Sequence, residues 1–278
     1  MKNKVLIIGK RSFIANNLII YLKKKIDVKL ISYKSFLKIK NFNKYTYVIN
    51  CSTKIEYLKH KYSVKSDLDI LIAKKILNFK KCKFIFLSSR KIYKPNANIK
   101  ENSRILLRDN YSKNKFITEK KINKILPGRV LILRISNLIG INKKNSNKLH
   151  KIFLDYFVEN IKNNIIFENE KIYKDFLPIK IFSQIVYLLI KNGEKGTYNV
   201  SLGKKVYLNK IIHWLNYHNR NKVKIMKLNK KQTKKLNRDS FFLNNTKLKK
   251  AINIKVGLND LKKECLAISK NLFYEKTN

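Results

Sequence analysis

Residues 4–15 read Lys-Val-Leu-Ile-Ile-Gly-Lys-Arg-Ser-Phe-Ile-Ala and give the first indication of the fold. The continuous apolar run at 5–8 is typical of a strand that is buried on both faces of a parallel sheet. Gly9 ends this run, and apolar residues then recur at helical spacing as far as Leu22. A buried strand, a glycine turn and a helix in this order predict the first half of a β-α-β unit.

The alternation of strand and helix continues over about the first 135 residues. Further strand patterns lie at 28–31, 45–50, 84–87 and 130–133. Further helical patterns lie at 68–77 and 109–125. This order is typical of repeated β-α-β units and predicts an α/β fold with a Rossmann-like, doubly wound parallel sheet.

Beyond residue 145 helical patterns dominate, and they lie at about 146–162, 180–191, 207–218 and 259–273. Two short strand patterns occur at 165–167 and 198–200. We therefore expect a dinucleotide-binding Rossmann domain at 1–160 and a smaller α+β substrate-binding region at 161–278. Within the second unit, about 180–200 is expected to return to the first domain.

The chain is strongly basic, with 64 Lys and Arg residues against 17 Asp and Glu residues and a formal net charge of +47. Only 8 of the 64 are Arg, and the Lys residues are spread evenly along the chain. Because readers of nucleic acid favour Arg for bidentate contacts, we expect no specific nucleic-acid partner. The composition resembles that of an A/T-biased genome, and its expected consequence is the attraction of small anions into any cleft.

Other classes of protein are disfavoured by what the sequence lacks. No apolar run approaches the roughly 18–20 residues that a membrane span needs. The three cysteines, Cys51, Cys82 and Cys265, have no metal-ligand or disulfide spacing, and the four histidines have no ligand spacing either. We expect a cytoplasmic protein with reduced thiols, no membrane span and no metal site.

Three short elements could carry chemistry. Gly9 supplies the tight turn that a dinucleotide site needs after the first strand, although Ser12 and Ala15 stand where two more glycines would be ideal. Tyr111 and Lys115 are four residues apart and share a helix face, where an ammonium favours the ionised phenol and hence proton exchange. Ser89 ends the fourth strand, at the edge where α/β sheets bind ligands.

Taken in order, these elements resemble the extended short-chain dehydrogenase/reductase family of NAD(P)-dependent sugar-nucleotide epimerases, dehydratases and reductases. The resemblance runs from residue 4 to about 270, and the matching motifs lie at 9–15, 48–53, 88–93, 111–119, 133–140, 174–179 and 198–201. The elements around Tyr111 and Asn137 are its most specific parts.

The resemblance implies a role for each motif residue. Tyr111 would be the general acid/base at a sugar hydroxyl or carbonyl, Lys115 would hold the nicotinamide ribose, and Ser89 would bind the reacting oxygen. Ser89 and Tyr111 would also bind substrate with Asn137 and Lys174, the latter replacing an arginine that grips the diphosphate. The residues implied in cofactor binding are Gly9, Arg11, Ser12, Phe13, Ile14, Ser32, Lys34, Cys51, Ser52 and Lys115.

Two departures bear on the cofactor and the reaction. The end of the second strand carries no acid to bind ribose hydroxyls, whereas Ser32 and Lys34 can serve a 2′-phosphate, so NADP is favoured over NAD. Dehydratases of the family carry an Asp-Glu pair where this chain has Arg90-Lys91, so elimination is not expected.

The expected function is therefore hydride transfer on a nucleoside-diphosphate sugar in cell-surface polysaccharide biosynthesis. Reduction of a 4-keto sugar is favoured over epimerisation. The alternative is a nucleotide-binding module of the same fold with weak or no catalysis, because fold alone does not establish an activity. A homodimer is left open.

Overall fold

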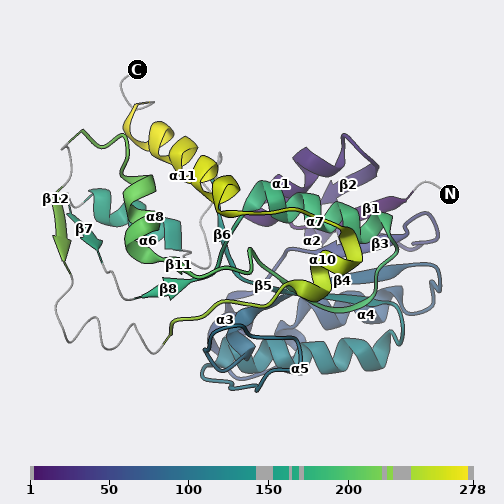
Figure 1. Ribbon diagram of the computed structural model, residues 1–278. Coiled ribbons are helices and arrows are strands. Elements are labelled where there is room, and N and C mark those ends of the chain that lie inside the picture. The colour runs from purple at the N-terminus through teal and green to yellow at the C-terminus, as the bar shows by residue number, and fades with distance from the viewer. Residues whose placement is uncertain are drawn as a thin grey trace.

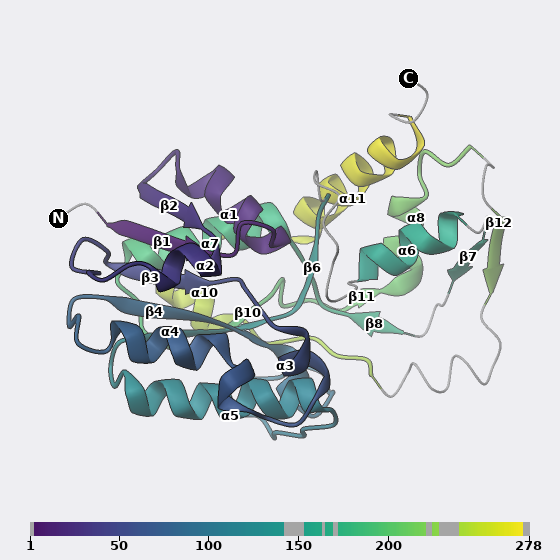
Figure 2. The same cartoon turned by 180° about the vertical axis from the view of Figure 1, so that it is seen from behind.

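The computed structural model describes residues 3–141, 153–162, 165–168, 172–220, 224–227 and 239–274. A larger lobe holds a central sheet between two layers of helices, and a smaller lobe of helices and short strands lies at one end of it (Figures 1 and 2). The first described residues lie in the larger lobe, and the last described helix lies in the smaller lobe.

The central sheet has six parallel strands in the order β10-β5-β4-β3-β1-β2. The strands are β1 (Lys4–Ile8), β2 (Asp27–Ile31), β3 (Tyr47–Asn50), β4 (Lys83–Ser89), β5 (Val130–Ile135) and β10 (Gly196–Val200). The chain passes from β1 to β2 on one side and then crosses to β3 on the other. The predicted doubly wound fold is confirmed, and its strand order reverses between β1 and β3, where folds of this type bind ligands at the carboxyl ends of the strands.

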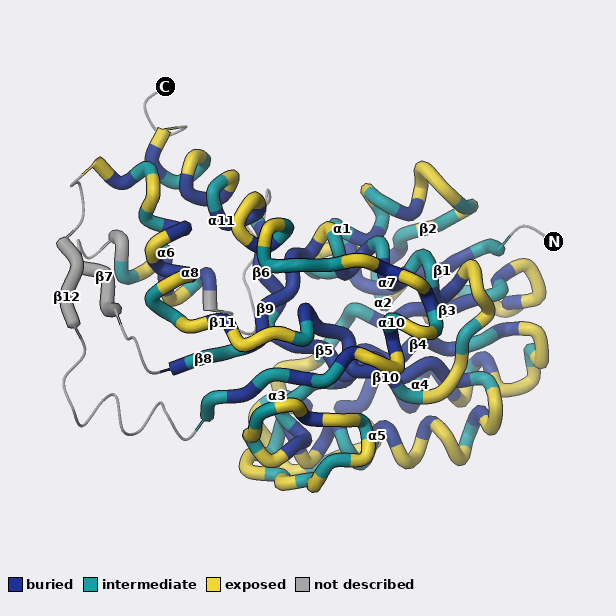
Figure 3. Tube along the Cα trace, viewed as in Figure 1, coloured by how far each residue is buried: buried dark blue, intermediate teal, exposed yellow. Residues whose placement is uncertain are grey.

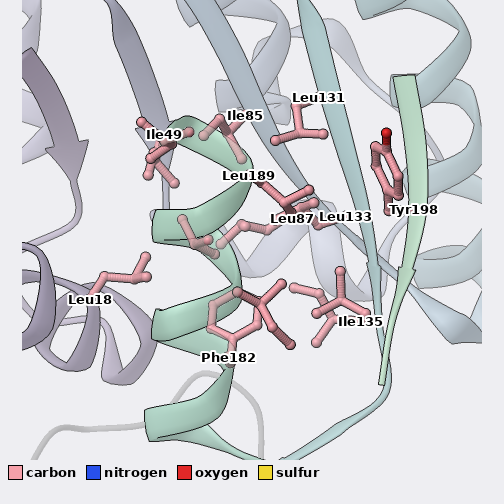
Figure 4. Packing of buried hydrophobic residues seen from close by; sticks show 14 of the residues in the cluster. Leu18, Ile49, Ile85, Leu87, Leu131, Leu133, Ile135, Phe182, Leu189 and Tyr198 are labelled. Carbon is pink, nitrogen blue, oxygen red and sulfur yellow. The ribbon is translucent and has the colours of Figure 1, made fainter. Parts of the chain in front are cut away.

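One face of the sheet is covered by α1 (Phe13–Leu22), α7 (Ile179–Lys191) and α10 (Thr246–Ile252). Figure 4 shows the core beneath them, where strand residues such as Ile85 and Leu133 meet Phe182 and Leu189 of α7. Because side chains alternate along a strand, the neighbouring residues Phe84 and Ile132 point to the other face. That face is covered by α2 (Tyr33–Leu37), α4 (Leu68–Ile76) and α5 (Asn110–Ile125).

The inner strands β1, β3, β4 and β5 are dark along most of their length in Figure 3, whereas the edge strand β2 and the helices also carry exposed residues. All four residues of β3 and all six of β5 are buried. The continuous apolar runs in the sequence are therefore the strands that lie between two helical layers.

The smaller lobe has its own core, formed by α6 (Phe153–Lys162), α8 (Leu208–Leu215) and α11 (Leu258–Phe273). Three two-stranded pairs accompany it: β6 (Asn137–Ile139) with β9 (Phe176–Pro178), β8 (Tyr173–Lys174) with β11 (Val206–Tyr207), and β7 (Ile165–Glu168) with β12 (Lys224–Lys227). A short helix, α3 (Ile55–Lys59), and two 3₁₀ turns, η1 (Val64–Ser66) and η2 (Arg90–Ile92), complete the described chain.

The predicted elements differ from the observed ones mainly at their ends. The helix predicted at 207–218 ends at Leu215, where Asn216 leaves the helical conformation with φ −96° and ψ 1°. The helix predicted at about 146–162 is described only from Phe153, since 142–152 lie outside the described residues. The strand predicted at 198–200 is β10, which pairs with β5 in the central sheet. In the part of the chain that is described, no helix is long and apolar enough to cross a membrane.

Candidate active site

The turn after β1 lies directly against the end of β3. Gly9 has a φ of +122°, a conformation that side chains rarely adopt. Its N–H donates to the Ile31 carbonyl at 2.8 Å. A Cβ on Gly9 would lie 3.0 Å from the carbonyl carbon of Cys51 and 3.0 Å from Ser52 Oγ. The structure thus brings Gly9, Cys51 and Ser52 together at the carboxyl ends of β1 and β3.

The other two positions of the turn do not require glycine. Ser12 is extended, with φ −75° and ψ 132°, and its hydroxyl caps α1 by accepting the Ala15 N–H at 3.4 Å. Ala15 is fully buried and small enough to let α1 pack on the sheet. The first N–H groups of a helix lack partners within it and, with the helix dipole, favour a phosphate. The turn therefore fits a dinucleotide pyrophosphate despite both substitutions.

The remaining residues expected at the cofactor surround this turn. Arg11 is exposed, and Phe13 and Ile14 are half-buried in the first turn of α1. Ser32 directly follows β2 and caps α2 by accepting the Ser35 N–H at 3.0 Å, while Lys34 is exposed. Ser32 and Lys34 thus lie next to the Gly9 turn, which is hydrogen-bonded to the end of β2.

Lys115 lies deep in the larger lobe and is 6% exposed. Its Nζ donates to the Leu87 carbonyl of β4 at 2.8 Å and lies 4.0 Å from Asp69 Oδ2. Asp69 Oδ1 also accepts from Asn50 Nδ2, at the end of β3, at 2.8 Å. This network ties the ammonium on α5 to the carboxyl ends of β3 and β4.

Asp69 was missed by the sequence analysis. Burial, opposed by the nearby Lys115 ammonium, raises the pKa of Asp69 to about 7. The sequence contained one indication of Asp69: it is an acid among the apolar residues of 68–77, most of which are buried in α4. In a chain with so many Lys residues, that acid alone did not indicate which ammonium it would face.

Tyr111 is the second residue of α5, one turn before Lys115. A capping box fixes the start of this helix: Asp109 Oδ1 accepts the Ser112 N–H at 2.7 Å, and Ser112 Oγ accepts the Asp109 N–H at 3.2 Å. Because α5 packs against β4, its Tyr111 end lies on the side of the sheet where Ser89 ends that strand. Ser89 Oγ accepts the N–H of Lys91 at 3.2 Å.

Tyr111 also forms part of the wall of a cavity of about 490 Å³. The other residues of the wall are Leu58, Lys59, Lys91, Arg108, Asp109, Asn110 and Lys113. We call this space the Tyr111 cavity.

A buried ion pair lies beneath these residues. Arg134 on β5 donates to both carboxylate oxygens of Glu119 on α5, at 3.1 Å and 2.7 Å. Glu119 also accepts a hydrogen bond of 2.5 Å from Ser88, next to Ser89 on β4, and Arg134 donates to the Tyr93 hydroxyl at 2.7 Å. One network thus fixes β4, β5 and α5 relative to one another.

Lys174 lies among other cations. Its Nζ donates to the Asp239 carbonyl at 2.6 Å and is 5.7 Å from the Phe241 ring centroid. The guanidinium carbon of Arg90 lies over the same ring, 3.9 Å from its centroid. Burial, together with the nearby Arg90, lowers the pKa of Lys174 to about 8. The charge of the Lys174 ammonium is therefore only partly neutralised by nearby anions, and an anionic ligand would stabilise it.

Asn137 begins β6, which pairs with β9, and its N–H donates to the Asp175 carbonyl at 3.2 Å. The buried Asp175 carboxylate accepts the N–H groups of Leu202, Gly203 and Leu243 at 3.0–3.2 Å. Asp175 thus holds together the segments around β9 and is a structural residue. Among the described residues, no group of three His, Cys, Asp or Glu side chains is placed to hold a metal ion.

We expect Gly9→Ala to weaken nicotinamide-cofactor binding and to lower the melting temperature. A positive φ costs a residue with a side chain about 1–3 kcal/mol, and the new Cβ would also press on Cys51. Calorimetric titration with NADPH and NADH would measure the effect. Gly128→Ala is the matched control, because Gly128 has a φ of +69° but no atom within 4 Å of an added Cβ. A Gly9→Ala protein that binds both cofactors like the parent would contradict the assignment.

Comparison with known proteins gives one family. The family described as "NAD dependent epimerase/dehydratase family" matches residues 5–201, which is more than half of the chain. No curated protein sequence matches.

Solved structures show the same fold at low sequence identity. A UDP-N-acetylglucosamine 4-epimerase from Methanobrevibacter ruminantium in complex with UDP-N-acetylmuramic acid has a TM-score of 0.77 at 18% identity, over 100% of both chains. RMD from Pseudomonas aeruginosa complexed with NADPH has a TM-score of 0.73 at 17% identity, over 98% of both chains. A dTDP-4-dehydrorhamnose reductase from Clostridium acetobutylicum has a TM-score of 0.67 at 16% identity, over 94% of this chain and 98% of its own.

Proposed function

This chain belongs to the NAD dependent epimerase/dehydratase family, and from that membership we propose that it transfers hydride at the sugar of a nucleoside-diphosphate sugar. The observation that best supports this is the position of Ser89, Tyr111 and Lys115. Two come from one face of α5 and one from the end of β4, at the carboxyl ends of the strands of a doubly wound sheet. The same edge of the sheet carries the glycine turn at Gly9, which fits a dinucleotide.

The proposed roles follow from the chemistry of the side chains. A nicotinamide cofactor supplies or accepts hydride at a sugar carbon when it is bound. Tyr111 then gives a proton to, or takes one from, the oxygen on that carbon, as a general acid or base. The Ser89 hydroxyl donates a hydrogen bond to the same oxygen. Lys115, held by Leu87 and Asp69, keeps a positive charge near the phenol and binds ribose hydroxyls.

We propose that the two lobes divide the ligands. Residues 1–160, with the returning segment at about 180–200, hold the cofactor, and the rest of 161–278 holds the sugar nucleotide. The observation that supports the returning segment is that α7 and β10 belong to the central sheet and its helical cover. Asn137 and Lys174 are the proposed contacts to the substrate, the latter to its diphosphate.

Reduction of a 4-keto sugar is the favoured reaction. The supporting observation is Arg90-Lys91 after Ser89, where a dehydratase needs acids to remove and donate protons. Epimerisation is the second candidate, since the family includes epimerases and a similar solved structure is a UDP-N-acetylglucosamine 4-epimerase. The two reactions differ in their net consumption of cofactor: a reductase consumes one NAD(P)H per sugar, whereas an epimerase returns its cofactor unchanged.

The test is a single-turnover assay on the purified full chain. NADPH or NADH oxidation is followed at 340 nm with 4-keto derivatives of uridine, thymidine and guanosine diphosphate sugars, and the sugar products are separated by configuration. Stoichiometric oxidation supports a reductase, and a changed configuration without net oxidation supports an epimerase. A protein that binds neither cofactor, or that changes no sugar, would contradict the proposal.

We expect NADP(H) to bind more tightly than NAD(H), and Ser32→Asp to reverse this preference. Asp is as good a helix cap as Ser, so α2 should be retained. Its carboxylate would repel a 2′-phosphate by about 1–4 kcal/mol at 4 Å, which corresponds to roughly a 5- to 1000-fold change in the affinity ratio.

Calorimetry with both cofactors measures this ratio. Asn43→Asp adds the same charge on an exposed loop before β3, at the amino end of that strand and away from the end where Ser32 lies, and should leave the ratio unchanged. Tighter binding of NAD(H) than NADP(H) to the parent would contradict the assignment of Ser32 and Lys34.

A further inference from the structure

The wall of the Tyr111 cavity is more basic than the chain as a whole. Lys59, Lys91, Arg108 and Lys113 are four of its eight residues, and Asp109 is the one acid among the eight. Over the whole sequence, 64 of 278 residues are Lys or Arg. The cavity is therefore about twice as basic as composition alone would give.

These cations have few anionic partners. Lys91 Nζ lies 3.9 Å from Asp109 Oδ2, and Arg108 Nη1 lies 2.5 Å from Asp239 Oδ1. Asp109 also accepts the Ser112 N–H as the cap of α5, so its carboxylate interacts with the helix N-terminus as well as with Lys91. Within the described part of the chain, Lys59 and Lys113 have no ion pair.

Arg90 adds a fifth cation beside the cavity. Its guanidinium carbon lies 3.9 Å from the Phe241 ring centroid, and the guanidinium has no hydrogen-bond partner among the described residues. Burial lowers the pKa of Arg90 to about 10, which indicates a charge that this protein does not fully compensate. Stacking on a ring fixes the plane of a guanidinium and leaves its N–H groups free to bind a planar anion. Arg90 and Arg108 are also two of only 8 arginines in the chain.

A diphosphate does not balance this charge. Among the described residues, the four cations of the cavity wall together with Arg90 and Lys174 make six, against the two carboxylates of Asp109 and Asp239, an excess of four. A diphosphate diester supplies about two negative charges, so about two positive charges remain. Their position is informative: Arg90 and Lys91 directly follow Ser89, and Lys91 Nζ lies 5.5 Å from the Tyr111 ring centroid. Arg90 and Lys91 therefore place part of this positive charge beside the proposed site of the reacting sugar.

We propose that the sugar of the substrate carries a carboxylate, and that this carboxylate binds to Lys91 in the wall of the Tyr111 cavity and to Arg90 beside it. The proposal rests on the proposed function and adds the substrate class. It also gives a physical reason for basic residues after Ser89, because acids at these two positions would repel such a sugar.

The experiment compares matched pairs of nucleotide sugars that differ only in one carboxylate. Each pair consists of a glycuronic acid and its neutral hexose on the same nucleotide, with uridine, thymidine and guanosine diphosphates tested in turn. Dissociation constants are measured by calorimetry with the full chain and saturating cofactor. A hydrogen-bonded charge pair should make the acidic member bind roughly 10- to 100-fold more tightly, with the ratio decreasing as salt is added.

Three variants locate the effect. Lys91→Met removes one of the two proposed charges but keeps a long side chain, and should lower the ratio of the two affinities several-fold. Lys113→Met, on the exposed side of the cavity, should lower the ratio by a smaller factor. Lys120→Met is the matched control, because Lys120 is exposed on the same helix but is not part of the cavity wall. It should leave the ratio unchanged.

The outcomes separate this proposal from the proposed function. Equal binding of acidic and neutral sugars, or a ratio that Lys91→Met does not change, would overturn the carboxylate site while the chain remains a nucleotide-sugar enzyme. If no pair binds although NADPH does, the sugar-nucleotide function fails and the carboxylate site fails with it. A preference that is lowered in Lys91→Met and kept in Lys120→Met supports the carboxylate site.

Discussion

Replacing Tyr111 by Phe is expected to lower turnover by roughly 10²–10⁴-fold, the usual effect of losing a general acid or base. The substitution removes one hydroxyl and keeps the ring against the cavity wall. The melting temperature and the affinity for NADPH should therefore stay close to those of the parent. The measurement is single-turnover oxidation of bound NADPH with the sugar nucleotide that the parent reduces.

Lys115→Met is the companion variant, and it should reduce both turnover and cofactor affinity because Lys115 is assigned two roles. If Tyr111 were only a packing residue, Phe would be nearly silent in every assay. A Tyr111→Phe enzyme as fast as the parent would remove the general acid/base from the mechanism. Tyr21→Phe, on the opposite face of the sheet in α1, is a control for loss of a tyrosine hydroxyl elsewhere.

Removal of Glu119 should cause a large loss of stability. Glu119→Ala leaves the Arg134 guanidinium, in a residue that is 8% exposed, without its carboxylate. Breaking a buried ion pair from one side costs about 3–5 kcal/mol. For a domain of 150–250 residues this corresponds to a decrease in melting temperature of roughly 6–20 °C. Urea unfolding of parent and variant measures the free energy directly.

Two further variants test the cause. Glu119→Leu combined with Arg134→Met removes both charges and should cost less than Glu119→Ala, because no unpaired charge remains buried. Asp27→Ala breaks the ion pair with Lys4, whose side chains are 35% and 53% exposed, and should cost at most about 1 kcal/mol. Equal losses for Glu119→Ala and Asp27→Ala would show that burial of the pair is not what matters.

The sequence was sufficient for the fold because the central strands are buried on both faces. Such strands must be apolar throughout, so β1, β4 and β5 appear as continuous runs with recognisable ends. The exposed ends of elements were less predictable. At Asn216, for example, a helix end depends on local turn geometry that a periodic pattern does not contain.

The site was predictable only where residues are close in sequence. Tyr111 and Lys115 are one helical turn apart, so their common face follows from spacing alone. The contact of Arg90 with Phe241 and that of Lys115 with Asp69 join residues far apart in the chain. In a chain where Lys is the main cation everywhere, only the folded structure shows which cations gather beside Tyr111.

The position of β10 has a consequence for synthesis of the chain. Its partner β5 is complete at Ile135, but β10 begins only at Gly196, roughly 60 residues later. At about 5–20 residues per second, a ribosome takes about 3–12 s to cover this interval. During that time β5, all of whose residues are destined for the core, is an open sheet edge that can pair with another nascent chain. Chains terminated before Gly196 keep this edge permanently and are expected to aggregate, which makes the interval between β5 and β10 the vulnerable period of biosynthesis.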